Sequence, residues 1–184
     1  MPSATWPIHV NPEHLYFITT SAIHHAHIFQ RDVIKRILVD TLNTGRILEQ
    51  YALFAFVIMP NHIHFIVRCQ HNHTPATITR EFKKATANLI IRHYEAEANA
   101  NVLNFLAGVA PKDQQYNVWE HEYEAKNIYT PDFLRQKLDY VHNNPLQPHW
   151  RLAERPEAYL WSSARYYLSG GRALIPLSDA RELL

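Results

Sequence analysis

The hydrophobic pattern along the chain divides into short β-type runs and longer helical repeats. Two β-type runs, 14–21 and 51–59, are rich in aromatic and branched residues, which favour strands. A third run, 62–68, follows the second after a single Pro-Asn pair, which is close enough for the two to form a hairpin. A fourth strand is predicted at 116–123, where the sequence YNVWEHEY mixes aromatic and polar residues.

Three other stretches repeat apolar residues at helical spacing. The first covers 31–41, and we expect this helix to end at Gly45. The second covers 77–97. The third begins with the sequence Thr-Pro-Asp at 130–132, in which threonine caps the helix, proline occupies the first helical position and an acid follows in the first turn. This helix should stop near Asn143, because a proline two residues later disfavours further helix.

The order of these elements predicts the fold class. Segment 99–115 is polar, and we expect it to be irregular. The remaining order, β-α-β-β-α-β, is that of a ferredoxin-like antiparallel sheet with both helices on one face. The helix at 130–143 and the tail would be appended to that sheet. We therefore predict an α+β fold in a single domain, 1–184, with its core at about 14–145 and a C-terminal extension at 146–184.

Composition narrows the classes of protein that the chain can represent. Its 184 residues are 47% hydrophobic, which suits one domain with a sizeable core. No apolar run is long enough to span a membrane and no signal peptide is visible, so we expect a soluble cytoplasmic protein with no membrane partner. Cys69 is the only cysteine, which excludes internal disulfides and a Cys-based zinc cluster. The net charge of +1 means that any contact with nucleic acid must rest on a local basic patch.

His62 and His64 are the strongest chemical signal in the chain. They lie in the run FAFVIMPNHIHFIV, and alternate side chains of a strand share one face, so the two imidazoles would stand side by side. Such a pair is half of a metal site. Ordinary packed or solvated histidines remain an alternative, because the chain has thirteen histidines. The other His-x-His pairs are His25/His27 and His71/His73.

The third predicted helix carries a second group of polar residues. Lys137, Tyr140 and Asn144 are spaced i, i+3 and i+7, which places them on one face beside an apolar stripe. Tyr140 has two interpretations. Its ring is either a half-buried packing element with a polar tip, or its hydroxyl is a nucleophile of the kind that forms covalent intermediates.

Four segments together resemble a known family, the small single-tyrosine HUH transposases of insertion sequences, and most closely their REP-associated tyrosine transposase branch. MPNHIHFIV resembles the family's metal strand, and DYVHNNP resembles its tyrosine helix. Trp119 with Glu120 resembles the strand before that helix, and WSSARYY, at 161–167, resembles the motif that follows it. The segments occur in the family's order, and their combination is far more specific than any one of them.

The resemblance implies a metal-dependent endonuclease and strand transferase that acts on single-stranded DNA beside a hairpin, as a monomer or a homodimer. A divalent metal ion, Mg²⁺ or Mn²⁺, would bind His62 and His64, and Asn144 would complete its shell. Tyr140 would form a 5′-phosphotyrosine intermediate, and Lys137 would favour its phenolate. The basic residues on the second and third helices that we expect to bind DNA are Lys83, Lys84, Arg92 and Arg135.

Three other functions stay open from the sequence. A histidine-triad nucleotide hydrolase would need a third alternating histidine, but Ile66 occupies that position. A metal-dependent phosphodiesterase without a covalent intermediate would use the two histidines and a carboxylate such as Glu120. A domesticated relative that has lost cleavage would be a non-catalytic nucleic-acid-binding module, because a fold does not determine a function.

Overall fold

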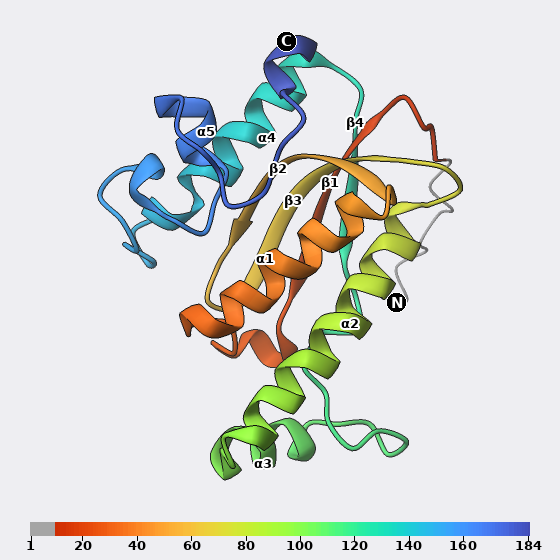
Figure 1. Cartoon of the computed structure of the whole chain (residues 1–184), viewed down its shortest axis with the longest axis vertical. Coiled ribbons are helices and arrows are strands. Elements are labelled where there is room, and N and C mark those ends of the chain that lie inside the picture. Colours follow the sequence, from red (N-terminus) through yellow and green to blue (C-terminus); the bar gives the residue numbers. More distant parts are fainter. Residues whose placement is uncertain (1–9) are drawn as a thin grey trace, which may run out of the picture.

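The computed structural model describes residues 10–184, in which an antiparallel sheet has helices against both of its faces (Figure 1). The strands are β1 (Leu15–Ser21), β2 (Tyr51–Ile58), β3 (His62–Cys69) and β4 (Glu124–Ile128), and they lie side by side in the order β2-β3-β1-β4. One strand separates each pair that a helix connects, as expected for split β-α-β units. The predicted α+β class and antiparallel sheet are confirmed.

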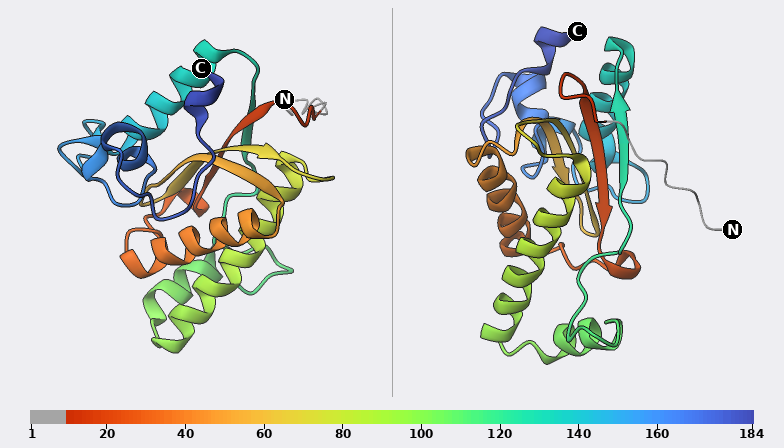
Figure 2. Two further views of the ribbon diagram at one scale, coloured as in Figure 1. Left: turned by 45° about the horizontal axis from the view of Figure 1, so that its top comes forward. Right: turned by 90° about the vertical axis from the view of Figure 1, so that its right-hand side faces the viewer.

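The helices form two layers (Figure 2). Helices α1 (Asp32–Ile47) and α2 (Pro75–Ala96) cover one face of the sheet, and α4 (Pro131–Asn143) lies across the other. Helix α3 (Ala100–Gly108) extends from the end of α2, and α5 (Ala164–Ser169) belongs to the C-terminal extension. No helix within the described residues is long and apolar enough to cross a membrane. Short 3-10 turns occur at Ile23–His25, Asn144–Leu146, Pro156–Ala158 and Ala180–Leu183.

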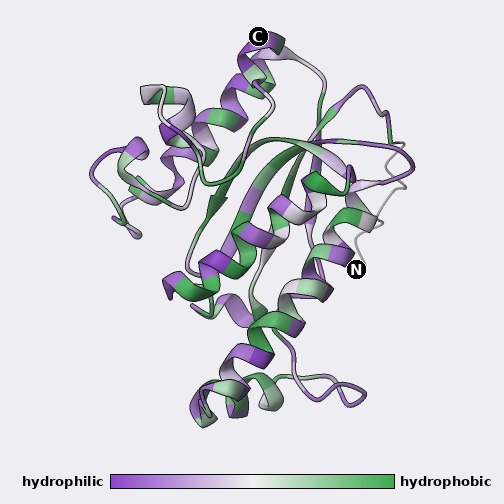
Figure 3. Ribbon diagram, in the orientation of Figure 1, coloured by the Kyte–Doolittle hydropathy of each residue, from purple (hydrophilic) through white to green (hydrophobic). Residues whose placement is uncertain are grey.

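Strand β3 separates an apolar layer from a layer that contains the histidines. Ile63 and Phe65 are fully buried toward α2, where the Phe65 ring lies 6.0 Å from that of Phe82. Burial of side chains of this size stabilises the fold by about 1.5–3 kcal/mol each. In Figure 3, hydrophobic residues predominate along β2 in the centre, whereas hydrophobic and hydrophilic residues alternate along α1 and α2. His62 and His64 project from the opposite face of β3, toward α4.

The ends of the helices follow their capping residues. The Thr74 and Thr77 side chains form a capping box at the start of α2. The Thr130 hydroxyl accepts a hydrogen bond from the Phe133 N–H at the start of α4, as predicted. The expectation that Gly45 ends α1 is wrong, because the helix continues to Ile47. Gly45 is needed for close packing instead, since a Cβ there would lie 2.5 Å from the Tyr51 hydroxyl.

Two predicted segments differ from the structure. The segment 99–115, expected to be irregular, contains α3, which the Asn99 side chain caps and which buried Leu106 anchors. The predicted strand at 116–123 is also wrong, because the fourth strand is β4. The Trp119 indole donates a hydrogen bond to Thr86 of α2, at 3.1 Å, so this part of the chain packs beside the helix. Its backbone forms only one isolated bridge within the described residues, with Ala22 directly after β1.

The C-terminal extension covers the outer edge of β2. The Ile58 N–H donates to the Trp161 carbonyl at 2.8 Å, and the Ser163 N–H donates to the Phe56 carbonyl at 2.9 Å. Further along, the Ser178 N–H donates to a carbonyl of the same strand at 2.8 Å. These bonds satisfy backbone groups that an edge strand would otherwise expose.

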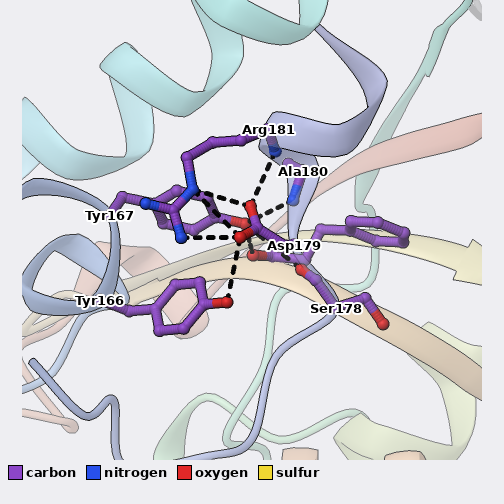
Figure 4. A network of polar contacts seen from close by, with 7 residues as sticks. Tyr166, Tyr167, Ser178, Asp179, Ala180 and Arg181 are labelled. Carbon is purple, nitrogen blue, oxygen red and sulfur yellow. Dashed lines mark hydrogen bonds and ion pairs between the residues drawn. The ribbon is translucent and has the colours of Figure 1, made fainter. Parts of the chain in front are cut away.

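Tyr167 joins two parts of this extension to β2 (Figure 4). Its hydroxyl donates to the Phe54 carbonyl at 2.7 Å and accepts from the Ala180 N–H at 3.1 Å. Asp179 and Arg181 form an ion pair of 2.6 Å beside it. The Tyr167 hydroxyl is therefore fully used in holding the fold together.

Candidate active site

The two histidines of β3 stand next to each other on the face covered by α4. The ring centroids of His62 and His64 are 4.7 Å apart. His64 is 4% exposed, whereas His62 is partly open to solvent. The register of the sheet places Thr19 of β1 directly opposite His64. The strand therefore provides two imidazoles at a rigid, partly open position.

Hydrogen bonds assign the same tautomer to both rings. Asn61 Oδ1 lies 2.6 Å from His62 Nδ1, and this oxygen is an acceptor, so Nδ1 carries the proton. Asn144 Nδ2, a donor, lies 3.3 Å from His64 Nε2, so His64 Nδ1 carries its proton and donates to Thr19 Oγ1 at 2.7 Å. The Nε2 atom of each histidine is left with a lone pair, the form in which imidazole binds a metal.

Burial keeps both histidines neutral. It lowers the pKa of His62 to about 4, although the nearby Asn144 side chain favours the charged form of the ring, and the charges of His25 and His149 lower this pKa further by smaller amounts. Burial also lowers the pKa of His64 well below its usual value, and the charges of His62 and Lys137 add to the effect. Near neutral pH neither ring must lose a proton before it binds a cation.

Helix α4 brings the candidate nucleophile to the histidines. The Tyr140 ring lies 5.1 Å from the His64 ring and 5.9 Å from the Phe17 ring. Tyr140 is 41% exposed, and its hydroxyl makes no hydrogen bond with the described part of the chain. The Lys137 ammonium lies 5.5 Å from the centre of the same tyrosine ring. Burial, and then the charge of Lys126, lower the pKa of Lys137.

The side-chain oxygen of Asn144 is suited to bind a metal ion. It lies directly after α4 and is 2% exposed. Its amide oxygen is buried and has no hydrogen-bond partner among the described residues, which is costly unless something binds it. Two neutral imidazoles and an amide oxygen fit a divalent cation that accepts both nitrogen and oxygen ligands. Residues 10–184 contain no cluster of three or more His, Cys, Asp or Glu side chains for a metal.

Small polar residues hold α4 in place against the sheet. His142 Nε2 lies 2.9 Å from Ser163 Oγ, which in turn accepts from the Phe56 N–H at 3.1 Å. Burial lowers the pKa of His142 to about 4, so this ring is also neutral. On the same helix, Leu134, Leu138 and Val141 are buried. Ser163, from the WSSARYY motif, therefore fixes the helix that carries the tyrosine.

The basic residues predicted to bind DNA lie in different places. Lys83 and Lys84 are on α2, on the sheet face opposite the histidines (Figure 2), and Arg92 is exposed further along the same helix. The Lys83 ammonium donates to three backbone carbonyls, those of residues 120–122, at 2.9, 3.2 and 2.9 Å. Arg135 is exposed on α4 and pairs with Asp132 at 2.8 Å. Of these four, the structure brings only Arg135 onto the helix of Tyr140.

Two further residues, Lys126 and Glu124, lie on the same face of the sheet as His64, and the sequence analysis did not single out either of them. Lys126 of β4 lies opposite Phe17 in the sheet, on the same face as His64, and pairs with Glu124 at 2.9 Å. A hollow of about 680 Å³ is lined in part by Thr19 of β1 and Glu124 of β4, and neither His62 nor His64 lines it. Lys126 would have been found from the alternation of β4 if that strand had been predicted at its true position. The Glu120 carboxylate, which the phosphodiesterase alternative would use, accepts a hydrogen bond from the His24 N–H at 2.6 Å.

Comparisons with known proteins agree with the earlier resemblance. The family described as "Transposase IS200 like" matches residues 13–106, which include the histidine pair. No curated protein matches the sequence. Among solved structures, a REP-associated tyrosine transposase bound to a REP hairpin has a TM-score of 0.57 and 17% identity over 90% of this chain and 86% of that chain. A candidate transposase from Deinococcus radiodurans has a TM-score of 0.46 and 17% identity over 70% and 88%.

Proposed function

Because the chain belongs to the IS200-like transposase family, we propose that it cuts and rejoins single-stranded DNA beside a hairpin, with Tyr140 as the nucleophile. The observation that carries the proposal is the position of Tyr140, whose ring lies 5.1 Å from the His64 ring although the two residues belong to different elements. The REP hairpin bound to a protein of similar fold supports hairpin DNA as the class of substrate.

In this proposal His62, His64 and Asn144 hold a divalent metal ion. The ion would neutralise charge that develops on the oxygens of the scissile phosphate. Imidazole nitrogens suit Mn²⁺ better than Mg²⁺, which prefers oxygen, so both ions should support activity and Mn²⁺ should bind more tightly. The tautomer of each histidine supports this role, since Asn61 and Thr19 bind the Nδ1 atoms and leave Nε2 available.

The residues of α4 would perform the cleavage. The Tyr140 oxygen attacks phosphorus and gives up its proton, while the bond between phosphorus and the 3′ oxygen breaks and that oxygen takes a proton. The products are a free 3′-hydroxyl and a 5′-phosphotyrosine link. One phosphate ester has replaced another, so a second 3′-hydroxyl can displace the tyrosine and rejoin DNA without ATP. The Lys137 ammonium, 5.5 Å from the tyrosine ring, would stabilise the phenolate.

The exposure of Tyr140 supports the nucleophile over a packing role. A buried tyrosine normally gives its hydroxyl a partner, as Tyr167 does with the Phe54 carbonyl. Tyr140 is 41% exposed and its hydroxyl is not used in this way within the described residues.

The test is formation of a covalent adduct between the protein and a labelled hairpin oligonucleotide with single-stranded flanks. We expect a denaturation-resistant adduct with Mn²⁺ or Mg²⁺, none with EDTA, and none in Tyr140→Phe. The matched control is Tyr129→Phe, which changes another tyrosine near α4 that is 72% exposed and should leave the adduct intact. Peptide mapping should place the DNA on residue 140.

The other outcomes separate the alternative functions. Cleavage without an adduct, at the wild-type rate in Tyr140→Phe, would indicate a phosphodiesterase in which water attacks. Hairpin binding without cleavage under all metal conditions would indicate a non-catalytic nucleic-acid-binding module. Either result would contradict the proposal.

A further inference from the structure

An aromatic group beside His62 takes no part in the proposed cleavage. The Trp150 indole is partly exposed and lies 5.9 Å, centre to centre, from the His62 ring. Two exposed imidazoles flank the indole, His27 at 5.5 Å and His149 at 5.3 Å. The rings are tilted by 42° and 48° to the indole, so neither imidazole stacks flat on it. We call Trp150, His27 and His149 the Trp150 cluster.

Local backbone structure holds this cluster in place without a ligand. The N–H groups of Trp150 and Arg151 both donate to the Gln147 carbonyl, at 2.8 and 3.0 Å. Arg151 has a φ of 46°, a conformation that side chains other than glycine rarely adopt. The next N–H, that of Leu152, donates back to the Pro145 carbonyl at 2.9 Å. The turn is therefore directly connected to the residue that follows Asn144, and the indole is positioned relative to the candidate active site.

The chemistry of the cluster suits one type of ligand. Within residues 10–184, no group of three His, Cys, Asp or Glu side chains that could hold a metal ion is found around Trp150. A packing role alone would bury the rings, whereas both imidazoles are exposed. Aromatic rings that are partly open to solvent, next to a site for a DNA phosphate, are the surfaces on which unpaired bases stack.

We propose that the Trp150 cluster binds, by stacking, an unpaired nucleobase next to the phosphate that is cut. This inference rests on the proposed function, because it takes single-stranded DNA as the substrate. Stacking is tolerant of sequence, since every base has an aromatic face. The cluster would hold the DNA strand in register with Tyr140 whichever base is present. Any preference for a particular DNA sequence would come from hydrogen bonds elsewhere.

The experiment measures DNA binding by fluorescence anisotropy, in the Tyr140→Phe background so that nothing is cut. One probe is a labelled DNA hairpin with single-stranded thymidine flanks on both sides. The other probe is the same hairpin with abasic flanks, which keep every phosphate and remove every flanking base. We expect the abasic flanks to weaken binding about tenfold. Trp150→Ala should weaken binding of the thymidine probe by a similar factor and leave binding of the abasic probe nearly unchanged.

Two control variants distinguish stacking from a loss of structure. Trp150→Phe keeps an aromatic ring and should retain most of the difference between the two probes. Phe105→Ala removes an aromatic side chain that is 39% exposed on α3, an element that contributes no residue to the cluster, and should behave as the parent. Equal weakening of both probes by Trp150→Ala, or no weakening of either, would overturn the inference. Failure of the parent protein to bind either probe would instead overturn the proposed function.

Discussion

Replacing Thr19 with valine tests whether β1 controls the orientation of His64. Valine keeps the shape of threonine and removes the oxygen that lies 2.7 Å from His64 Nδ1. Because His64 is only 4% exposed, water cannot easily replace that oxygen. A buried donor left without a partner costs about 1–3 kcal/mol of unfolding free energy. In a chain of 184 residues, each kcal/mol corresponds to about 2–4 °C, so the melting temperature should fall by several degrees.

The same substitution should affect metal binding more strongly than stability. Without the Thr19 hydroxyl, no hydrogen bond fixes the tautomer of His64 at Nδ1, and removal of such a supporting partner typically weakens metal affinity by about 10–100-fold. Titration calorimetry with MnCl₂ measures this affinity, and thermal unfolding without metal measures stability separately. Thr19→Ser keeps the hydroxyl and should restore most of the Mn²⁺ affinity.

The adjacent Thr20 provides a matched control. Its hydroxyl is buried, at 1% exposure, and has no partner within the described residues, and its side chain projects from the opposite face of the sheet. Thr20→Val should therefore leave Mn²⁺ affinity unchanged and keep or raise the unfolding free energy. Unchanged Mn²⁺ affinity in Thr19→Val would refute the argument, as would equal losses in both valine variants.

Three other changes give contrasting outcomes. His64→Ala should abolish Mn²⁺ binding and cleavage while circular dichroism shows an intact fold, and cleavage at the wild-type rate would contradict the metal assignment. Lys126→Ala combined with Lys137→Ala should reduce the slope of log DNA affinity against log salt concentration by about one unit for each DNA phosphate that these lysines neutralise. An unchanged slope would show that these two lysines do not contact DNA phosphates. Lys83→Ala should lower the unfolding free energy in urea by about 1–3 kcal/mol, because three backbone carbonyls lose their donor, whereas exposed Lys84→Ala should change it by less than about 0.5 kcal/mol. Equal stability of those two variants would contradict the structural role of Lys83.

Local patterns predicted the elements that carry their own signals. The hairpin of β2 and β3 follows from two apolar runs around a Pro-Asn pair, and the alternation of β3 places both histidines on one face. The start of α4 follows from its Thr-Pro-Asp sequence. Strand β4 was missed because its sequence, EAKNI, lacks the apolar alternation of a strand with one buried face, and only Ile128 of its five residues is buried.

The supporting residues of the site could not be predicted, because their partners are distant in the sequence. Thr19 and His64 are 45 residues apart, and Ser163 and Phe56 are 107 apart. Threonine, serine and asparagine occur throughout any chain, and nothing in their local context indicates which of them will meet a histidine. The role of Lys83 was hidden for the same reason, since its three acceptors are backbone groups about 38 residues away.

The contacts between β2 and the C-terminal extension also set the time at which the site can form during synthesis. Helix α4 is fixed through Ser163, and Tyr167 reaches back to Phe54 across 113 residues. At about 5–20 residues per second, a ribosome needs roughly 5–20 s to travel from His64 to Tyr167. During that interval the nascent chain carries its histidine pair without a fixed tyrosine helix. We therefore expect the proposed DNA cleavage to be confined to chains translated beyond the extension, so that prematurely terminated products would leave DNA intact.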